Sequence, residues 1–379
     1  MLDVHAVPSL WGSKPLLGEP RPGTVRLRCP PDDLVALRRS YSGLHLEPLV
    51  RAVRAHNGRR PFAPPAKRRV GLMVLADYEN FFHQFGSLVI AWAALQDSFT
   101  NEGSVVPHDD IEVLLLSNTS VKPTALFWSP GLTGGATPPR FVRAAPPPPP
   151  ATYERLILVQ PATETWWWNV WNRDAADRRR VLSPLVSRLT SSLLPPMAAE
   201  TAQAQAAAHA ALASGPRAVG GAGAASLVVI HRPFGSDRRV LNDAALVAAL
   251  DGAILGGTLG SAGRALRGAR LVDLGLLSTR AQLVLIRGTG MLVGAHGAGL
   301  LWNLFLPDGA PVLELLNAQN ANAYYRNHCL WSRRPYVSWQ NNHTAEEQPF
   351  RLPSGEAAAP FRNHMQVDVR AIVALARTL

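Results

Sequence analysis

Apolar positions follow two periods along the second half of the chain. Short apolar runs predict buried strands, and apolar residues at every third or fourth position predict helices with one buried face. The predicted strands are 227–231, 271–274, 291–295 and 312–316, and the predicted helices are 242–250, 279–287, 299–306 and 367–379. Asn242 is expected to cap one helix, and Thr279 with Gln282 matches a capping box at the start of another. This alternation indicates a parallel sheet with helices on both faces, an α/β fold.

The first half has a similar pattern with longer irregular stretches. Apolar runs predict strands at 70–76, 111–116 and 156–159, and helical spacing predicts a helix over 81–99. The polyproline run Pro146–Pro150 forms a stiff extended spacer, and strand-like sequence resumes after it. We therefore interpret this run as an insertion loop within a first domain.

Shifts in composition divide the chain into four parts. Residues 1–65 are rich in Pro and Arg with weak periodicity, which predicts an arm or a partial subdomain. The Ala- and Gly-rich stretch 198–225 contains a linker over 215–223. The expected parts are an N-terminal arm (1–65), a first domain (66–215), a second domain (224–345) and a C-terminal tail with a final helix (346–379).

The composition is that of a globular protein and excludes several classes. The 379 residues are 47% hydrophobic, no apolar run reaches the ~20 residues of a membrane span, and the first residues lack a signal-peptide pattern. The net charge is +11, but the arginines are scattered rather than gathered in a stripe, which argues against a nucleic-acid partner. Cys29 and Cys329 form no zinc spacing, and two free thiols are favoured over one bridge.

A glycine-rich turn follows the strand at 291–295 and precedes a helix. The turn carries Gly294, His296, Gly297 and Gly299, and such a turn at a helix N-terminus suits a phosphate-bearing ligand. Its GxxGxG spacing differs from the dinucleotide GxGxxG pattern, and no Walker lysine follows, so NAD and ATP loops are disfavoured. We interpret His296 as lying beside a bound phosphate or sugar, in preference to a satisfied histidine in a tight turn.

Charged residues near the ends of two other predicted strands extend this candidate site. Arg232 and Arg238 follow the first strand of the second half, where the fork of a guanidinium suits a diphosphate. Asn242 is a further candidate there, although a helix cap is its favoured interpretation. Glu314 lies among apolar residues on a buried strand, so it requires a partner, either a ribose diol or an arginine.

The first domain offers candidates for acid–base chemistry and for acceptor binding. Asp77 and Glu79 follow a strand and His83 lies one turn into the next helix, so one of them is a candidate general base. Acids that complement the helix dipole are the alternative. Trp167 and Trp168, within a run of three tryptophans, would form an acceptor platform, with core packing at least as well supported.

Four ordered motifs resemble those of glycosyltransferase family 61. They are DYENFFHQFGSLVIAWAAL, the block with Arg232, Arg238 and Asn242, GAHGAGLLWNLFLPDGAPVLEL, and AYYRNHCLWSRRPYVSWQNN. The resemblance covers about residues 65–345 and implies a GT-B fold. Such a fold has two Rossmann-like domains facing a central cleft, with the last helix crossing back to the first domain.

The resemblance also implies an inverting transfer of N-acetylglucosamine or xylose from a UDP-sugar to a hydroxyl of a glycan or glycoprotein. No metal or other cofactor is obligatory in that reaction, and no Asp-x-Asp motif follows a predicted strand. Arg232, Arg238 and the helix after His296 would neutralise the departing diphosphate, and Glu314 would hold the ribose. One of Asp77, Glu79 and His83 would take the proton of the acceptor.

The same resemblance implies a location in the lumen of the Golgi or the endoplasmic reticulum. The anchor or signal peptide usual in that family is missing from this sequence, so membrane attachment would require an anchor that the sequence does not contain. An inactive relative that binds glycans or proteins is the alternative function.

Overall fold

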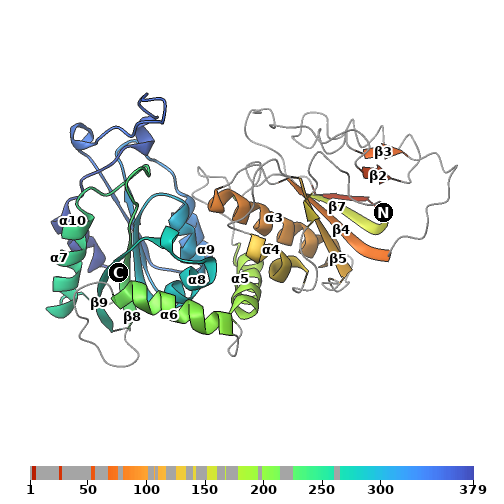
Figure 1. The fold of residues 1–379 in the computed structure, drawn as a ribbon, viewed down its shortest axis with the longest axis horizontal. Helices are drawn as coiled ribbons and strands as arrows, with labels where there is room; N and C mark the ends of the chain where they lie inside the picture. The colour runs from red at the N-terminus through yellow and green to blue at the C-terminus, as the bar shows by residue number, and fades with distance from the viewer. Residues whose placement is uncertain are drawn as a thin grey trace. The chain divides into compact units, whose positions relative to one another are not determined.

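The chain divides into two compact units, Met1–Asn169 and Val170–Leu379 (Figure 1). The computed structural model describes residues 2–5, 25–27, 53–55, 67–75, 80–100, 106, 110–116, 125–133, 140–141, 152–159, 167, 178–194, 199–213, 225–259 and 265–379. Each unit is built on a five-stranded parallel sheet, as the alternation of apolar runs predicts.

The first unit has the strand order β1-β7-β4-β5-β6. Its strands are β1 (Leu2–His5), β4 (Lys67–Leu75), β5 (Ile111–Leu116), β6 (Arg140–Phe141) and β7 (Thr152–Val159), with β2 (Val25–Leu27) and β3 (Val53–Ala55) in a separate pair. Its helices are α3 (Phe81–Thr100) and α4 (Ala125–Leu132). Helix α3 starts where the Asn80 side chain accepts the Phe82 amide at 2.8 Å, and it buries Phe85, Leu88 and Leu95 at helical spacing.

The second unit has the strand order β12-β11-β10-β8-β9. Its strands are β8 (Ala225–Ile230), β9 (Leu266–Val272), β10 (Thr289–Ala295), β11 (Val312–Leu316) and β12 (Tyr336–Gln340). Its α-helices are α5 (Arg179–Leu193), α6 (Ala199–Ala213), α7 (Asp243–Leu255), α8 (Thr279–Arg287), α9 (Tyr324–Trp331) and α10 (Val369–Ala376). Its 3₁₀ helices are η4 (Leu274–Leu276), η5 (Ala298–Phe305), η6 (Thr344–Glu346) and η7 (Pro360–Arg362).

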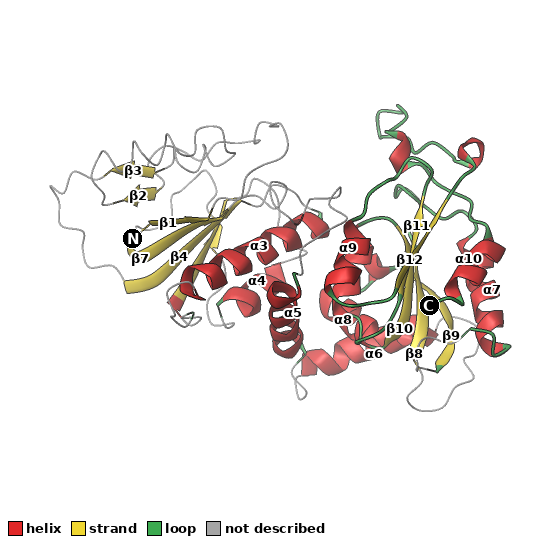
Figure 2. Cartoon of the chain, turned by 180° about the vertical axis from the view of Figure 1, so that it is seen from behind, coloured by secondary structure: helices red, strands yellow, loops and turns green. Residues whose placement is uncertain are grey.

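Helices cover both faces of this second sheet (Figure 2). Alternate strand residues such as Val229, Val293 and Leu313 pack with Leu250 of α7 and Ile372 of α10 in one buried cluster. Helices α8 and α9 lie on the other side with η5. Strands β10 and β11 are buried along their whole length, which explains their continuous apolar sequence.

The last helix belongs to the second unit. The apolar face of α10 packs on α7 and β12, with Ile372 and Ala376 inside the core of this unit. The expectation that this helix crosses back to the first domain is therefore wrong, because its apolar residues pack in the core of the second unit. Helices α5 and α6 also lie in the second unit, where α6 packs on α8, whereas the predicted linker 215–223 lies outside the described residues.

Local helix chemistry differs from the sequence interpretation at three places. Helix α8 has the predicted bounds, but its N-cap is Ser278, whose hydroxyl accepts the Ala281 amide at 3.3 Å, so the capping box on Thr279 is wrong. The predicted helix 299–306 is the 3₁₀ helix η5. Asn242 stands at the N-cap position of α7 without a capping hydrogen bond.

The described residues include neither a membrane-spanning helix nor a cluster of metal-ligating side chains. None of the helices in this part of the chain has the length and apolar character that a bilayer span requires. The same residues contain no group of three or more His, Cys, Asp and Glu placed to hold a metal ion.

Candidate functional site

The candidate site lies where the strand order of the second sheet reverses. After β8 the chain forms β9 on one side of it, and β10 then takes the other side. In open parallel sheets the carboxyl ends of the strands at such a reversal border a ligand crevice. The residues that follow β8 and β10 are His231 with Arg232, and His296 with Gly297. Three of the sequence-predicted residues of the second half, Arg232, His296 and Gly297, therefore fall at this edge.

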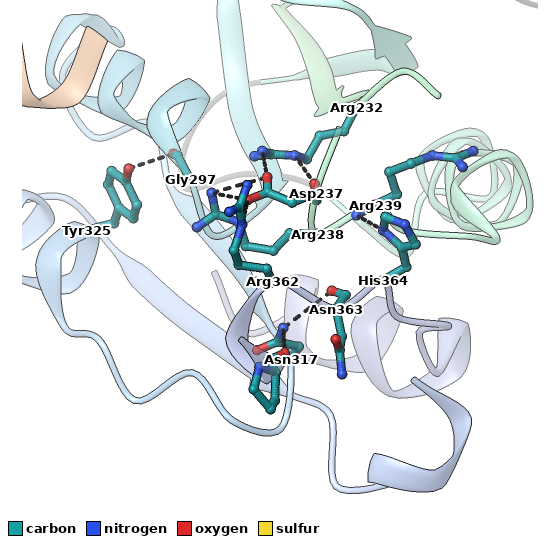
Figure 3. A network of polar contacts seen from close by, with 11 residues as sticks. Arg232, Asp237, Arg238, Arg239, Gly297, Asn317, Tyr325, Arg362, Asn363 and His364 are labelled. Atoms are coloured by element: carbon teal, nitrogen blue, oxygen red, sulfur yellow. Dashed lines mark hydrogen bonds and ion pairs between the residues drawn. The ribbon is translucent and has the colours of Figure 1, made fainter. Parts of the chain in front are cut away.

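Three arginines converge on Asp237 in the loop after β8 (Figure 3). Arg232 donates from Nε to the Asp237 main-chain oxygen at 2.7 Å and from Nη2 to Oδ1 at 2.5 Å. Arg238 Nη2 lies 3.2 Å from Oδ2, and Arg362 Nε donates to Oδ2 at 2.9 Å. Arg238 has φ of +52°, a strained value for a residue with a side chain, so the loop holds it firmly.

The cluster has a formal surplus of two positive charges, because three guanidinium groups share one carboxylate. Burial alone would raise the pKa of Asp237, but the charges of Arg238 and Arg232 outweigh burial and lower it. Burial and the charge of Arg238 lower the pKa of Arg232, which nevertheless stays a cation. The surplus makes this edge attractive to an anion.

Gly297 is the glycine of the turn that the cluster requires. It has φ of +155°, and a Cβ at this position would clash with Nη1 of Arg232. Tyr325 on α9 holds the turn from the other side, because its hydroxyl donates to the Gly297 oxygen at 2.6 Å (Figure 3). The guanidinium of Arg232 therefore lies directly against the backbone of the turn.

The other two predicted glycines of the turn have packing roles. A Cβ on Gly294 would lie 3.1 Å from Ile230 Cδ1 and 3.3 Å from Leu300 Cδ2, which is tight. A Cβ on Gly299 would meet atoms only at 3.4 Å and beyond, which is ordinary contact. All three glycines thus lie in or beside the turn after β10, and Gly297 is the one of the three that lies against Arg232.

His296 is held by a buried carboxylate and by aromatic rings. Its Nδ1 lies 2.5 Å from Glu314 Oε1, and its ring centroid lies 5.2 Å from that of Tyr325 and 6.0 Å from that of Tyr324. A carboxylate accepts only, so this contact requires a proton on Nδ1. Nε2 has no hydrogen-bond partner among the described residues and is the atom left for a ligand.

Glu314 serves His296 and not a ribose. The residue is 0% exposed, and its second oxygen accepts the Tyr336 hydroxyl at 2.6 Å. Strand register explains the pair, because Gly294 lies opposite Glu314 and His296 follows two residues later on the same side. The ribose role of Glu314 is therefore corrected to a positioning role, since neither of its oxygens is open to a ligand. Burial of the Tyr336 hydroxyl, and then the charge of Glu314, raise the pKa of Tyr336.

The Asn242 side chain joins the start of α7 to the backbone of Val367 instead of capping the helix. Its Oδ1 accepts the Val367 amide and its Nδ2 donates to the Val367 oxygen, both at 2.9 Å. Both groups of its amide thus bond to the Val367 backbone, and its predicted nucleotide-sugar contact stays a prediction. His231 Nδ1, next in sequence to Arg232, lies 2.7 Å from Asp243 Oδ2.

The predicted acid–base residues of the first domain are described only in part. Asp77 and Glu79 lie outside the described residues, whereas His83 lies half-buried on α3. Burial lowers the pKa of His83 to about 4, so the imidazole is neutral near pH 7. The choice of base stays a prediction.

The predicted aromatic platform is described only in part. Trp168 lies outside the described residues, but Trp167 is 1% exposed and packs on Phe82 and Phe85 at 5.5 and 6.1 Å between ring centroids. The core interpretation therefore describes Trp167, because covered ring faces cannot receive an acceptor.

The two cysteines are also described only in part. Cys329 is a buried free thiol, and burial raises its pKa. Cys29 lies outside the described residues.

Sequence reasoning missed Asp237, Arg362, Tyr325 and Tyr336. Arg362 contacts Asp237 from 125 positions away, and no local pattern distinguishes it from other arginines. Tyr336 lies on β12, whose mixture of polar and apolar residues hides an edge strand. Two signals were available: the motif AYYRNHCLWSRRPYVSWQNN contains Tyr325 and Tyr336, and the buried Glu314 requires donors and so indicates that polar partners surround it.

Comparisons with known proteins give one partial relationship in sequence. The chain is 38% identical over 95 residues to an EGF domain-specific O-linked N-acetylglucosamine transferase of Drosophila melanogaster. The matched stretch is 25% of this chain and 18% of the relative, so the chain spans about a fifth of the relative's length. No family model matches the chain.

A comparison with solved structures gives a fold likeness of low degree. A glycosyl transferase family 9 structure from Veillonella parvula DSM 2008 aligns with 82% of this chain and 96% of its own, with a TM-score of 0.34 and 6% sequence identity. A likeness at this TM-score carries no argument about the site or the activity.

Proposed function

We propose that this chain is a glycosyltransferase that transfers a sugar from a UDP-sugar to a hydroxyl of a glycan or glycoprotein. The arginine cluster at the strand reversal is the observation that carries the proposal, because its charge surplus suits a diphosphate. The partial match to an O-linked N-acetylglucosamine transferase supports N-acetylglucosamine as the sugar, with xylose as the alternative.

In the proposed reaction the acceptor oxygen attacks the anomeric carbon as the bond from that carbon to the diphosphate breaks. Arg232 and Arg238 would stabilise the negative charge on the departing diphosphate, so no metal is required. One of Asp77, Glu79 and His83 would accept the proton of the acceptor hydroxyl. Inversion at the anomeric carbon follows from a single displacement of this kind.

His296 would contact the same ligand through Nε2. The buried pair with Glu314 fixes the proton on Nδ1, so the ring presents one defined nitrogen. We further propose that the fold belongs to the GT-B class and that the protein acts in the lumen of the Golgi or the endoplasmic reticulum. The motifs that resemble those of family 61 support these two proposals.

Calorimetric titration of the chain with UDP, UDP-N-acetylglucosamine and UDP-xylose tests the donor site. We expect saturable binding by the wild-type chain and a loss of about 10- to 100-fold in Arg232→Ala, since a charge-assisted contact contributes about 1.5–3 kcal/mol. Arg370→Ala, on the exposed side of α10, is the matched control and should bind like wild type. Absence of saturable heat at millimolar ligand, or equal affinity in Arg232→Ala, would contradict the proposal.

Turnover separates an enzyme from an inactive relative. Release of free UDP from the preferred UDP-sugar, measured over a panel of glycan and glycoprotein acceptors, should exceed the rate with buffer alone. Binding of UDP without release over the whole panel would favour the alternative, a glycan- or protein-binding module.

A further inference from the structure

A long connection joins β12 to α10 and passes the candidate site. We call residues 341–368 the return loop. It contains two short 3₁₀ helices and two antiparallel bridges, Gln348 with His364 and Arg351 with Ala357, and no longer element. A connection of this length without regular structure is unusual in a compact unit and often carries function.

The last part of the return loop is fastened to the loop after β8. Met365 forms a parallel bridge with Val240, donates to the Arg239 oxygen at 2.9 Å and accepts the Leu241 amide at 2.8 Å. The Arg239 amide donates to Nδ1 of His364 at 3.2 Å (Figure 3). The stretch around residue 364 is therefore hydrogen-bonded to the loop after β8, beside the candidate site.

A second set of contacts fastens the return loop to the end of β11. Asn317 follows that strand, and its Nδ2 donates to the oxygens of Pro360 and Asn363 at 3.2 and 3.3 Å (Figure 3). The two sets of contacts enclose Arg362 on both sides in the sequence. Its backbone is thus fixed at the edge where β8 and β11 end.

The side chain of Arg362 is fixed at one nitrogen and open at the others. Nε donates to Asp237 Oδ2 at 2.9 Å, and the guanidinium carbon lies 4.9 Å from the centre of the Phe350 ring. The Arg362 oxygen also accepts the Arg238 amide at 3.0 Å. The side chain is 35% exposed, and both its Nη groups lack a partner among the described residues.

The same division holds for the other two arginines of the cluster. Arg232 uses Nε and Nη2 on Asp237, and Arg238 uses Nη2, which leaves Nη1 of each without a partner among the described residues. Asp237 thus binds one side of each guanidinium, and terminal N–H groups of all three remain for hydrogen bonds to a ligand. A diphosphate, with several oxygens and more than one negative charge, matches these donors.

We propose that Arg362 is a third diphosphate-binding residue and that the return loop supplies it to the site. This inference rests on the proposed function and extends it to a residue outside the resembling motifs. Asp237 is the positioning residue, because it holds the three cations in place before a ligand arrives and so lowers the entropic cost of binding. A purely structural ion pair between Arg362 and Asp237 would instead affect stability alone.

Titration of the full chain with inorganic pyrophosphate and with UDP tests this assignment. We expect Arg362→Gln to weaken both ligands by about 10- to 100-fold, since one charged donor pair is lost. Arg351→Gln is the matched control, because Arg351 lies in the same loop and, among the described residues, its side chain donates to the Gly355 oxygen at 2.8 Å and not to Asp237. The control should bind both ligands like wild type.

Arg362→Lys is a second variant that separates a binding defect from a folding defect. It keeps the positive charge beside Asp237 but lacks the two-pronged donor of the guanidinium. It should unfold at the wild-type temperature and bind pyrophosphate several-fold more weakly. Wild-type affinity in both Arg362 variants, with a loss in Arg232→Ala, would overturn this inference and leave the proposed function intact. If the wild-type chain binds neither pyrophosphate nor UDP, both this inference and the proposed function are overturned.

Discussion

At the scale of single residues, the site depends on partners that are distant in sequence. His296 and Glu314 were both singled out from the sequence, but their roles were separated there, and the structure joins them into one pair. The local pattern predicted a histidine in a glycine turn and an acid in a buried strand. It could not show that strand register places the acid beside the imidazole, because register depends on pairing between strands.

This pairing predicts the tautomer of His296. In the free protein, ¹⁵N spectra of histidine-labelled chain should show His296 protonated at Nδ1, with the signal assigned by its loss in His296→Gln. Glu314→Gln should shift that signal, because the side chain loses its charge, while Tyr336→Phe should cause a smaller shift since it removes one donor to Glu314. An Nδ1 without a proton in the wild-type chain would contradict the pairing.

The turn glycines predict a contrast between two neighbouring substitutions. Gly297→Ala should lower the free energy of unfolding by about 1–3 kcal/mol and weaken UDP binding, because the new Cβ strains the backbone and displaces Arg232. Gly299→Ala should have little effect on UDP binding, because its Cβ meets only ordinary contacts. Urea unfolding and calorimetry measure both effects, and equal behaviour of the two variants would refute the close approach of Arg232.

At the scale of elements, bounds were predictable where apolar sequence was continuous. Strands β5 and β11 have the predicted bounds, because they are short apolar runs that pair inside a sheet. Helix α9 and strand β12 were missed, since β12 alternates between half-buried and exposed residues at the sheet edge. Helical spacing in η5 predicted an α-helix, but periodicity does not distinguish a short 3₁₀ segment.

The contact between the return loop and α7 gives the prediction at this scale. Asn242→Ala should lower the free energy of unfolding by about 1–3 kcal/mol, because two hydrogen bonds to the Val367 backbone are lost. Asn242→Asp keeps the acceptor for the Val367 amide and should lose less. Urea unfolding checks the order of the two, and a larger loss in Asn242→Asp would show that the acceptor contact is not the one that matters.

At the scale of the whole molecule, the sequence predicted a parallel α/β architecture and the strand edge that carries the second-unit candidates. It did not predict that α10 packs in the second unit, because an amphipathic helix shows that it has a buried face but not which surface covers it. Arg362 was missed for a related reason. Its importance comes from a tertiary contact with Asp237, and a chain rich in scattered arginines gives no sign of which ones meet.

The return loop has a part that is held in place beside the arginines and a tip whose length and sequence are free to vary. Its residues 360–367 are fastened on two sides, while Leu352 and Gly355 near its tip close a turn on themselves at 2.8 Å. Insertions or deletions in this turn would leave the position of Arg362 unchanged. Related chains could thus acquire different surfaces beside the same edge of the sheet, and the tip is where an engineered peptide would be tolerated with least risk to the arginines.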